Sequence, residues 1–235
     1  MKNSIYNPRN WDQQPPYLYG DYKSTVLRSP SQPLIPLAQS LSELTGPVYG
    51  HADVDASDAD MTQNGRVNGE PLGERIIVAG RVLDDAGKPV PNTLIELWQA
   101  NAAGRYIHAG DQHDAPLDPN FFGGGRCVTD AHGNYRFVSV KPGAYPWGNH
   151  NNAWRPAHIH FSLFGSAFVT RLVTQMYFPG DPLLDLDPIF NATASAAVRA
   201  RLVADFCIDT TESSYALGYR FDVVLRGRDA TPIEE

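Results

Sequence analysis

Short runs of alternating apolar and polar residues recur from residue 75 onward, and turn residues separate them. Such runs are typical of β-strands, because successive side chains of a strand point to opposite faces. Their regular spacing predicts an all-β fold, an antiparallel β-sandwich with one or two short helices. The turn Asp130-Ala131-His132-Gly133 predicts a hairpin between its flanking strands. The expected strands are residues 75–83, 93–99, 127–129, 134–140, 158–164, 171–178 and 219–226.

Helical periodicity is confined to two segments. Residues 193–206 are rich in alanine, with apolar residues at helical spacing, which predicts the one true helix of the sandwich domain. Residues 37–44 could form about two further turns. Residues 1–70 are otherwise polar and irregular, so we expect them to form an N-terminal arm that packs on a partner subunit and over a functional site. A partly disordered tail is the alternative. Residues 71–235 form the predicted β-sandwich domain.

Composition narrows the class of protein. A chain of 235 residues with 42% hydrophobic content can build one large core. Its net charge of −7 argues against a nucleic-acid partner, which needs clustered Lys and Arg. No signal peptide follows Met1, and no apolar run approaches membrane-spanning length, so we expect a cytoplasmic protein without membrane attachment. Cys127 and Cys207 lack metal-site or redox-motif spacing, and we interpret them as free thiols rather than a disulfide.

The segment Trp154-Arg155-Pro156-Ala157-His158-Ile159-His160 carries the sharpest chemical signal. Residues two apart on a strand point the same way, so both imidazoles should face one side and Ile159 the other. Two adjacent imidazoles repel each other once protonated, and a shared metal ion explains the pair best. Ordinary packed or surface histidines remain the alternative.

Two tyrosines precede this segment in loops. Tyr145 lies in Pro142-Gly143-Ala144-Tyr145-Pro146-Trp147, where Pro and Gly restrict the backbone and could aim the phenol in a fixed direction. Tyr106 follows an expected strand, in the Gly-containing loop Gly104-Arg105-Tyr106. Each tyrosine alone is equally compatible with simple loop packing.

Taken in order, Gly-Arg-Tyr, Tyr-Pro-Trp and Trp-Arg-Pro-Ala-His-Ile-His resemble the intradiol ring-cleaving dioxygenases, over about residues 22–227. The match is closest to the β-type subunits of the branch that acts on protocatechuate. This resemblance implies a non-haem Fe³⁺ ion held by Tyr106, Tyr145, His158 and His160. The ligand types agree with that ion, because hard phenolate oxygens favour Fe³⁺ over Fe²⁺ and the metal lowers the phenol pKa.

The resemblance also implies the reaction. A catechol would chelate the ion in place of Tyr145, and O₂ would open the ring between the two hydroxyl-bearing carbons. Catalytic roles fall on Tyr145 and on Arg155, whose positive charge would stabilise the electron-rich ring. The implied substrate-binding residues, each of which could instead be purely structural, are Tyr22, Trp147, Arg155, Gln175 and Ile189.

Protocatechuate is the expected substrate and a carboxy-cis,cis-muconate the product. His113 and Gly148 depart from the family pattern, where Tyr and Arg are usual, so another anionic catechol such as 4-sulfocatechol is an alternative. The resemblance implies a homologous α subunit and an αβ hetero-oligomer. A β-sandwich subunit with a structural or absent metal is the non-enzymatic alternative. The two tyrosines speak against it, because structural sites usually use Cys and His with zinc.

Overall fold

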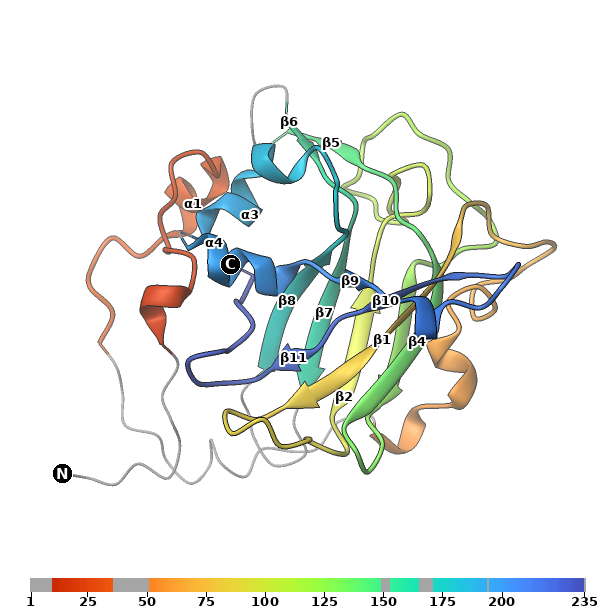
Figure 1. The fold of residues 1–235 in the computed structure, drawn as a ribbon. Helices are drawn as coiled ribbons and strands as arrows, with labels where there is room; N and C mark the ends of the chain where they lie inside the picture. Colours follow the sequence, from red (N-terminus) through yellow and green to blue (C-terminus); the bar gives the residue numbers. More distant parts are fainter. Residues whose placement is uncertain (1–9, 36–50, 149–152, 165–170, 194, 235) are drawn as a thin grey trace.

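The computed structural model describes residues 10–35, 51–148, 153–164, 171–193 and 195–234. Two β-sheets pack face to face and confirm the predicted sandwich (Figure 1). A separate two-stranded ribbon of β5 and β6 lies at one end of the sheets. The first sheet contains β1 (Arg75–Leu83), β4 (Asn134–Val140), β9 (Asp205–Phe206), β10 (Leu217–Arg220) and β11 (Val223–Val224). The second contains β2 (Leu94–Trp98), β3 (Gly124–Val128), β7 (His158–Phe164) and β8 (Arg171–Tyr177), and the ribbon joins β5 (Tyr145–Trp147) to β6 (Ala153–Arg155).

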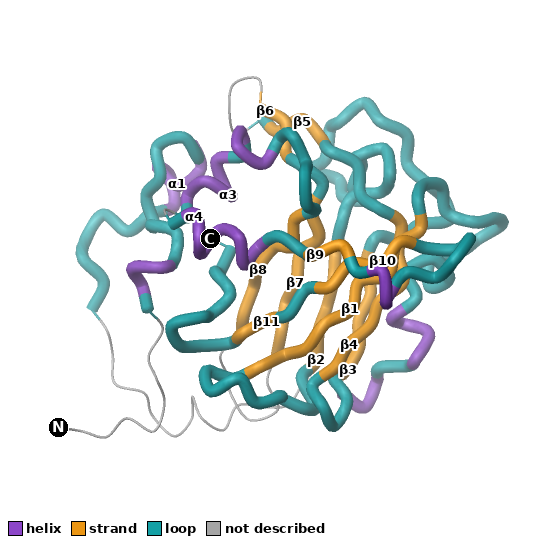
Figure 2. The backbone as a smooth tube through the Cα atoms, viewed as in Figure 1, coloured by secondary structure: helices purple, strands orange, loops and turns teal. Residues whose placement is uncertain are grey.

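Strand β7 places its two histidines outside the sandwich core. Its residues Ile159, Phe161 and Leu163 are buried between the two sheets, in the main apolar cluster. His158 and His160 alternate with them and therefore lie on the opposite face, which is also covered. Figure 2 shows β7 between β2 and β8, so its backbone is paired on both sides. Both histidines thus stand on a strand that the sheet holds rigidly.

Most strand pairs are antiparallel, as predicted, but β1 pairs in parallel with β10 and β11. The strand predicted at residues 219–226 is interrupted between these two. At the break, the Asp222 carboxylate accepts the Arg81 N–H at 2.9 Å in place of a backbone carbonyl. The chain also comes very close to β1 there, since a Cβ at Gly80 would lie 2.0 Å from the Phe221 carbonyl oxygen. Side-chain capping and close packing therefore end β10 early.

The predicted hairpin around residues 130–133 is wrong. The turn forms, and the Gly133 N–H donates to the Asp130 carbonyl at 3.0 Å. However, β3 pairs with β2, and β4 pairs with β1, so the turn carries the chain from one sheet to the other. Turn residues fix a reversal of direction, but the apolar faces of the two strands select the partners.

The predicted helix over residues 193–206 is also largely wrong. Only Ala196–Arg199 (α4) is α-helical, followed by a 3-10 turn at Ala200–Leu202. The Ala204 N–H then donates to the Tyr177 carbonyl at 2.9 Å, which draws the chain into an extended path beside β8. Val198 and Leu202 are buried as the periodicity predicts. Pairing with a sheet edge has overridden the helix propensity.

The remaining helices of the described ranges are short. They are α1 (Lys23–Arg28), α3 (Pro188–Ala192) and the 3-10 turns Trp11–Gln13, His51–Asp53, Ala56–Ala59, Leu184–Leu186 and Ile208–Thr210. Helices α1, α3 and α4 gather near the C-terminal end of the chain (Figure 1). No helix within the described ranges is long and apolar enough to cross a membrane. The turns expected at residues 37–44 lie outside the described residues.

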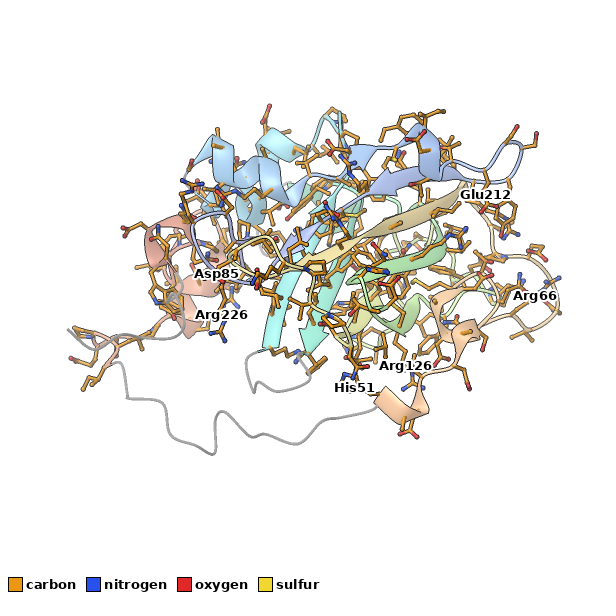
Figure 3. All side chains as sticks on the ribbon, turned by 60° about the horizontal axis from the view of Figure 1, so that its bottom comes forward. His51, Arg66, Asp85, Arg126, Glu212 and Arg226 are labelled. Atoms are coloured by element: carbon orange, nitrogen blue, oxygen red, sulfur yellow. The ribbon has the colours of Figure 1, made fainter. Side chains whose placement is uncertain are left out.

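The segment from residue 51 to residue 70 runs along the sandwich. Met61 is fully buried in the main core, and its N–H donates to the Val138 carbonyl at 2.9 Å. The Arg126 side chain donates a hydrogen bond from Nε to the Asp58 carboxylate at 2.9 Å. Figure 3 shows Arg126 and His51 at the same end of the molecule. His51 contacts the Asn92 carbonyl there at 3.1 Å. Both cysteines are free thiols, as predicted.

Candidate metal centre

The two histidines of β7 are both held by their Nδ1 atoms. His158 Nδ1 lies 2.7 Å from the Pro156 carbonyl oxygen, and His160 Nδ1 lies 2.9 Å from Glu234 Oε2. A carbonyl oxygen and an ionised carboxylate oxygen only accept hydrogen bonds. Each ring therefore carries its proton on Nδ1 and presents a lone pair on Nε2. The ring centroids are 4.9 Å apart. Burial and the charge of Arg155 lower the pKa of His158 well below its usual value, which favours the neutral ligand form.

Two glycines bring the tyrosine loops into contact. Gly104 has φ +79°, and a Cβ there would lie 2.2 Å from the Ala144 carbonyl oxygen. A Cβ at Gly143 would lie 2.5 Å from the Ala102 carbonyl oxygen in the opposite loop. Because glycine has no side chain, the two loops can approach this closely. The Tyr106 and Tyr145 rings meet edge to face, with centroids 5.4 Å apart.

The four predicted ligands converge. Tyr145 Oη lies 3.3 Å from His158 Nε2, and the Tyr106 and His160 rings lie 6.4 Å apart. The buried Tyr106 hydroxyl has no hydrogen-bond partner among the described residues. No group of three or more His, Cys, Asp or Glu that could hold a metal occurs in the described part of the chain. The candidate centre therefore depends on its two phenols as well as on the histidines.

The electrostatics of the phenols fit a highly charged cation. Burial and the neighbouring Tyr145 raise the pKa of Tyr106 well above its usual value. Burial also raises the pKa of Tyr145, although Arg155 opposes it. Such phenols ionise at neutral pH only beside a strong positive charge, and a trivalent metal ion supplies one. The orphaned Tyr106 hydroxyl and the two Nε2 lone pairs are thus a donor set that a hard metal ion would satisfy.

Arg155 is fully enclosed beside the histidines. Its guanidinium pairs with the Asp187 carboxylate at 2.8 Å and donates to Gln175 Oε1 at 2.6 Å. It also donates to the Tyr177 hydroxyl at 3.0 Å and lies 3.0 Å from His158 Nε2. Burial opposes the charge of Arg155, but Tyr177 and Asp187 outweigh it and raise its pKa well above the usual value. A permanent positive charge therefore stands next to the candidate ligands.

A cleft of about 1010 Å³ opens beside the four ligands, and Tyr106, Tyr145, Trp147 and His160 line it. A separate cavity of about 20 Å³ is lined by the other substrate-binding candidates, which are Tyr22, Gln175 and Ile189. Tyr22 nevertheless reaches the cleft wall, because its ring packs against the Trp147 ring at 5.1 Å. Arg155 also lies over the Trp147 ring, at 5.7 Å from its centroid.

Three residues of the site escaped the sequence analysis. Trp98 stacks on the His160 ring at 4.7 Å with the planes 4° apart. Asp187 pairs with Arg155, and Glu234 with His160. Trp98 lies in the expected strand 93–99 and pairs with His160 in the observed ladder, so strand alternation could have suggested it. Asp187 and Glu234 lie 32 and 74 residues from their partners, and no local pattern marks them.

The chain is similar to several known proteins. A family profile described as "Dioxygenase" matches residues 44–227, and one described as "Protocatechuate 3,4-dioxygenase beta subunit N terminal" matches residues 7–40. The chain is 65% identical to the protocatechuate 3,4-dioxygenase beta chain of Burkholderia cepacia, over 98% of each chain. Its fold resembles the solved catechol 1,2-dioxygenase of Acinetobacter sp. ADP1, with 25% identity, a TM-score of 0.52 and coverage of 73% of this chain and 58% of that one. It also resembles the 3-chlorocatechol 1,2-dioxygenase of Rhodococcus opacus 1CP, with 21% identity, a TM-score of 0.55 and coverage of 73% and 65%.

Proposed function

The chain belongs to the family of intradiol ring-cleaving dioxygenases, and from this premise we propose that it is the metal-bearing β-type subunit of an enzyme that cleaves protocatechuate with O₂. The product is a carboxy-cis,cis-muconate. One observation carries the proposal most directly. Two phenols and two Nε2 lone pairs converge beside a cleft large enough for a single aromatic ring, as the chemistry of a catechol substrate requires.

Fe³⁺ is the proposed cofactor, and the residues that would hold it are Tyr106, Tyr145, His158 and His160. Bound Fe³⁺ would draw electron density from a chelated catecholate and make its ring reactive toward O₂. His158 Nε2 lies 3.0 Å from Arg155 Nη1. A metal ion at His158 would replace that hydrogen bond, and the guanidinium would retain Asp187 and Gln175 as partners.

The protein's own groups account for proton movement and orientation. Tyr145 Oη stands at the edge of the cleft, and its raised pKa makes it a good acceptor for a catechol proton once it is ionised. Arg155 offers a fixed positive charge to the electron-rich ring. Trp147 and Tyr22 form an aromatic wall that would orient the ring and limit the access of water. Gln175 holds Arg155 in place through its Oε1 atom.

Two residues that depart from the family pattern lie at the cleft, and they bear on the choice of catechol. His113 packs edge to face on Trp154 at 5.9 Å, and both residues line the cleft with Gly148. Among the described residues, no atom lies within 4 Å of a Cβ built at Gly148, so none of them fills the cleft at that point. This space could also accept the larger sulfonate of 4-sulfocatechol, which is the second candidate substrate.

A homologous α subunit is the proposed partner. The arm carries apolar side chains that the chain itself does not cover, since Leu27 is 91% exposed and Ile35 is 82% exposed. Exposed apolar groups on an irregular arm favour packing against another protein. The proposed division therefore keeps residues 1–70 as the arm that makes this contact and residues 71–235 as the catalytic domain, with Met61 of the arm also packed in the sandwich core. A cytoplasmic location is proposed from the two free thiols.

Product analysis tests this function. The chain is purified with its α partner and mixed with protocatechuate or 4-sulfocatechol under ¹⁸O₂. We expect one O₂ consumed per catechol, and a ring-opened product whose two new carboxyl groups together contain both oxygen atoms of the same O₂. Faster turnover of 4-sulfocatechol would change the substrate assignment alone. Cleavage outside the two hydroxyl-bearing carbons, or no oxygen uptake by an iron-loaded enzyme, would contradict the proposed function.

A further inference from the structure

The C-terminal segment of the chain runs along β8, the edge strand of the second sheet, and reaches the candidate metal centre. The Thr174 hydroxyl donates to the Pro232 carbonyl at 2.6 Å, and the Glu234 N–H donates to the Val173 carbonyl at 2.8 Å. The Ile233 N–H between them donates to Gln14 Oε1 at 2.8 Å. Strand β8 and the N-terminal arm thus hold the last residues of the described chain in a defined position, near α1 and α3 (Figure 1).

The C-terminal segment places the Glu234 carboxylate beside the candidate ligand His160. Glu234 Oε2 lies 2.9 Å from His160 Nδ1, and the Glu234 side chain is only 20% exposed. Trp98 stacks on the same imidazole and fixes its plane. Ring plane and tautomer are therefore both defined for His160, and its Nε2 atom points to the candidate site.

The two histidines differ in the group behind them. His158 Nδ1 donates to a neutral carbonyl of its own strand segment, whereas His160 Nδ1 donates to a carboxylate 74 residues away. An anionic acceptor makes an imidazole more basic and so a stronger ligand, and such partners typically contribute 10–100-fold in metal affinity. His160 is therefore the stronger of the two histidine ligands, and its strength depends on a residue of the C-terminal segment.

We infer that Glu234 is a positioning residue that fixes the Nδ1–H tautomer of His160 and strengthens it as a metal ligand through the hydrogen bond. The inference rests on the proposed function and extends it, because it makes the C-terminal segment part of the metal centre. It also links the arm to that centre, since Gln14 anchors the residue next to Glu234.

Glu234→Ala, Glu234→Gln and the control Glu212→Ala test the inference in the complete enzyme. Glu212 pairs with Arg136 and is half exposed, and Figure 3 shows it at the edge of the molecule. Iron affinity is measured by competition with a chelator, together with the visible spectrum and the unfolding temperature of the metal-free protein. We expect Glu234→Ala to lose about 10–100-fold in affinity. Glu234→Gln keeps a hydrogen-bond acceptor without the charge, so it should recover part of that loss.

Each outcome decides the inference. The inference is supported if iron affinity falls in the order Glu212→Ala, Glu234→Gln, Glu234→Ala while the metal-free unfolding temperatures of all three variants match. Equal affinity in Glu234→Ala and Glu212→Ala overturns it, as does a loss of affinity that merely follows a lower unfolding temperature in both Glu234 variants. The wild-type protein is measured in parallel. Failure of the wild type to bind iron would overturn the proposed function and the inference together, whereas an iron-binding wild type with an unaffected Glu234→Ala variant overturns the inference alone.

Discussion

The buried ion pair of Arg155 and Asp187 should be the most sensitive single contact of the site. Asp187 is completely buried, and Arg155 is 3% exposed. The carboxylate accepts from Arg155 at 2.8 and 3.3 Å and from the Tyr177 hydroxyl at 3.1 Å. It also caps α3 by accepting the Ile189 N–H at 3.3 Å. Replacing it leaves a buried guanidinium without its counter-charge.

Removing one partner of such a pair costs about 3–5 kcal/mol. Asp187→Asn keeps the size of the side chain and an oxygen for the helix cap, so its cost reports the lost charge. Asp187→Ala loses the cap as well, which adds about 1 kcal/mol. The whole stability of a domain is only about 5–15 kcal/mol, so either variant should be clearly impaired. Asp185→Asn, two residues away and exposed, is the matched control and should stay within about 0.5 kcal/mol of the wild type.

Urea unfolding of the complete enzyme at one fixed protein concentration measures these costs. Tryptophan fluorescence is a suitable probe, because Trp147 lies 5.7 Å from the Arg155 guanidinium. The reasoning would be refuted if Asp187→Asn unfolded within about 1 kcal/mol of the Asp185→Asn control, because that result would mean that the guanidinium needs no buried counter-charge.

Further predictions concern other parts of the chain. Gly143→Ala should push the two tyrosine loops apart and lower the iron content, since its Cβ would lie 2.5 Å from a backbone oxygen. Gly148→Ala, whose Cβ meets no atom of the described residues within 4 Å, is the control, and equal iron content in the two variants would contradict this. Burial raises the pKa of Cys127 to about 12, whereas a hydrogen bond from a threonine hydroxyl lowers that of Cys207. A thiol reagent at about pH 8 should therefore label Cys207 first, which mass spectrometry of peptides can check, and faster labelling of Cys127 would be contrary evidence. The hydrogen bond from Arg126 lowers the pKa of Asp58, so this pair contributes stability above the unfolded value of about 3.9 and loses it as pH falls through the lower folded value. Asp58→Asn should reduce the unfolding temperature of the metal-free protein at about pH 6 but not at about pH 2, and a pH-independent difference would contradict the assignment.

Local periodicity was sufficient to predict the part of the site carried by β7. Alternation along a strand requires His158 and His160 to share a face, and Ile159 is buried on the other, as predicted. The strand at residues 75–83 was likewise predicted with its observed bounds, because apolar residues and turn signals agree there. Where one physical signal determines a feature, the sequence can be interpreted reliably.

Features that depend on distant partners could not be predicted in this way. The turn at residues 130–133 has a hairpin sequence, yet the strand pairing is decided by the core between two sheets. Residues 193–206 have helix propensity, but the edge of β8 competes for their backbone. Glu234 reaches His160 only because the folded sheet and the arm position the C-terminal segment. Long-range hydrogen bonds of this kind leave no periodic trace in the chain.

The central claim is that Tyr106, Tyr145, His158 and His160 together hold Fe³⁺ and present it to a catechol. The most direct test is the visible absorption spectrum of the purified αβ enzyme, recorded with its iron content before and after anaerobic addition of protocatechuate. We predict a broad tyrosinate-to-Fe³⁺ band that shifts when the substrate is added and that weakens in Tyr106→Phe. A colourless sample with a full complement of iron would contradict the claim, because it would show that the phenols do not bind a ferric ion.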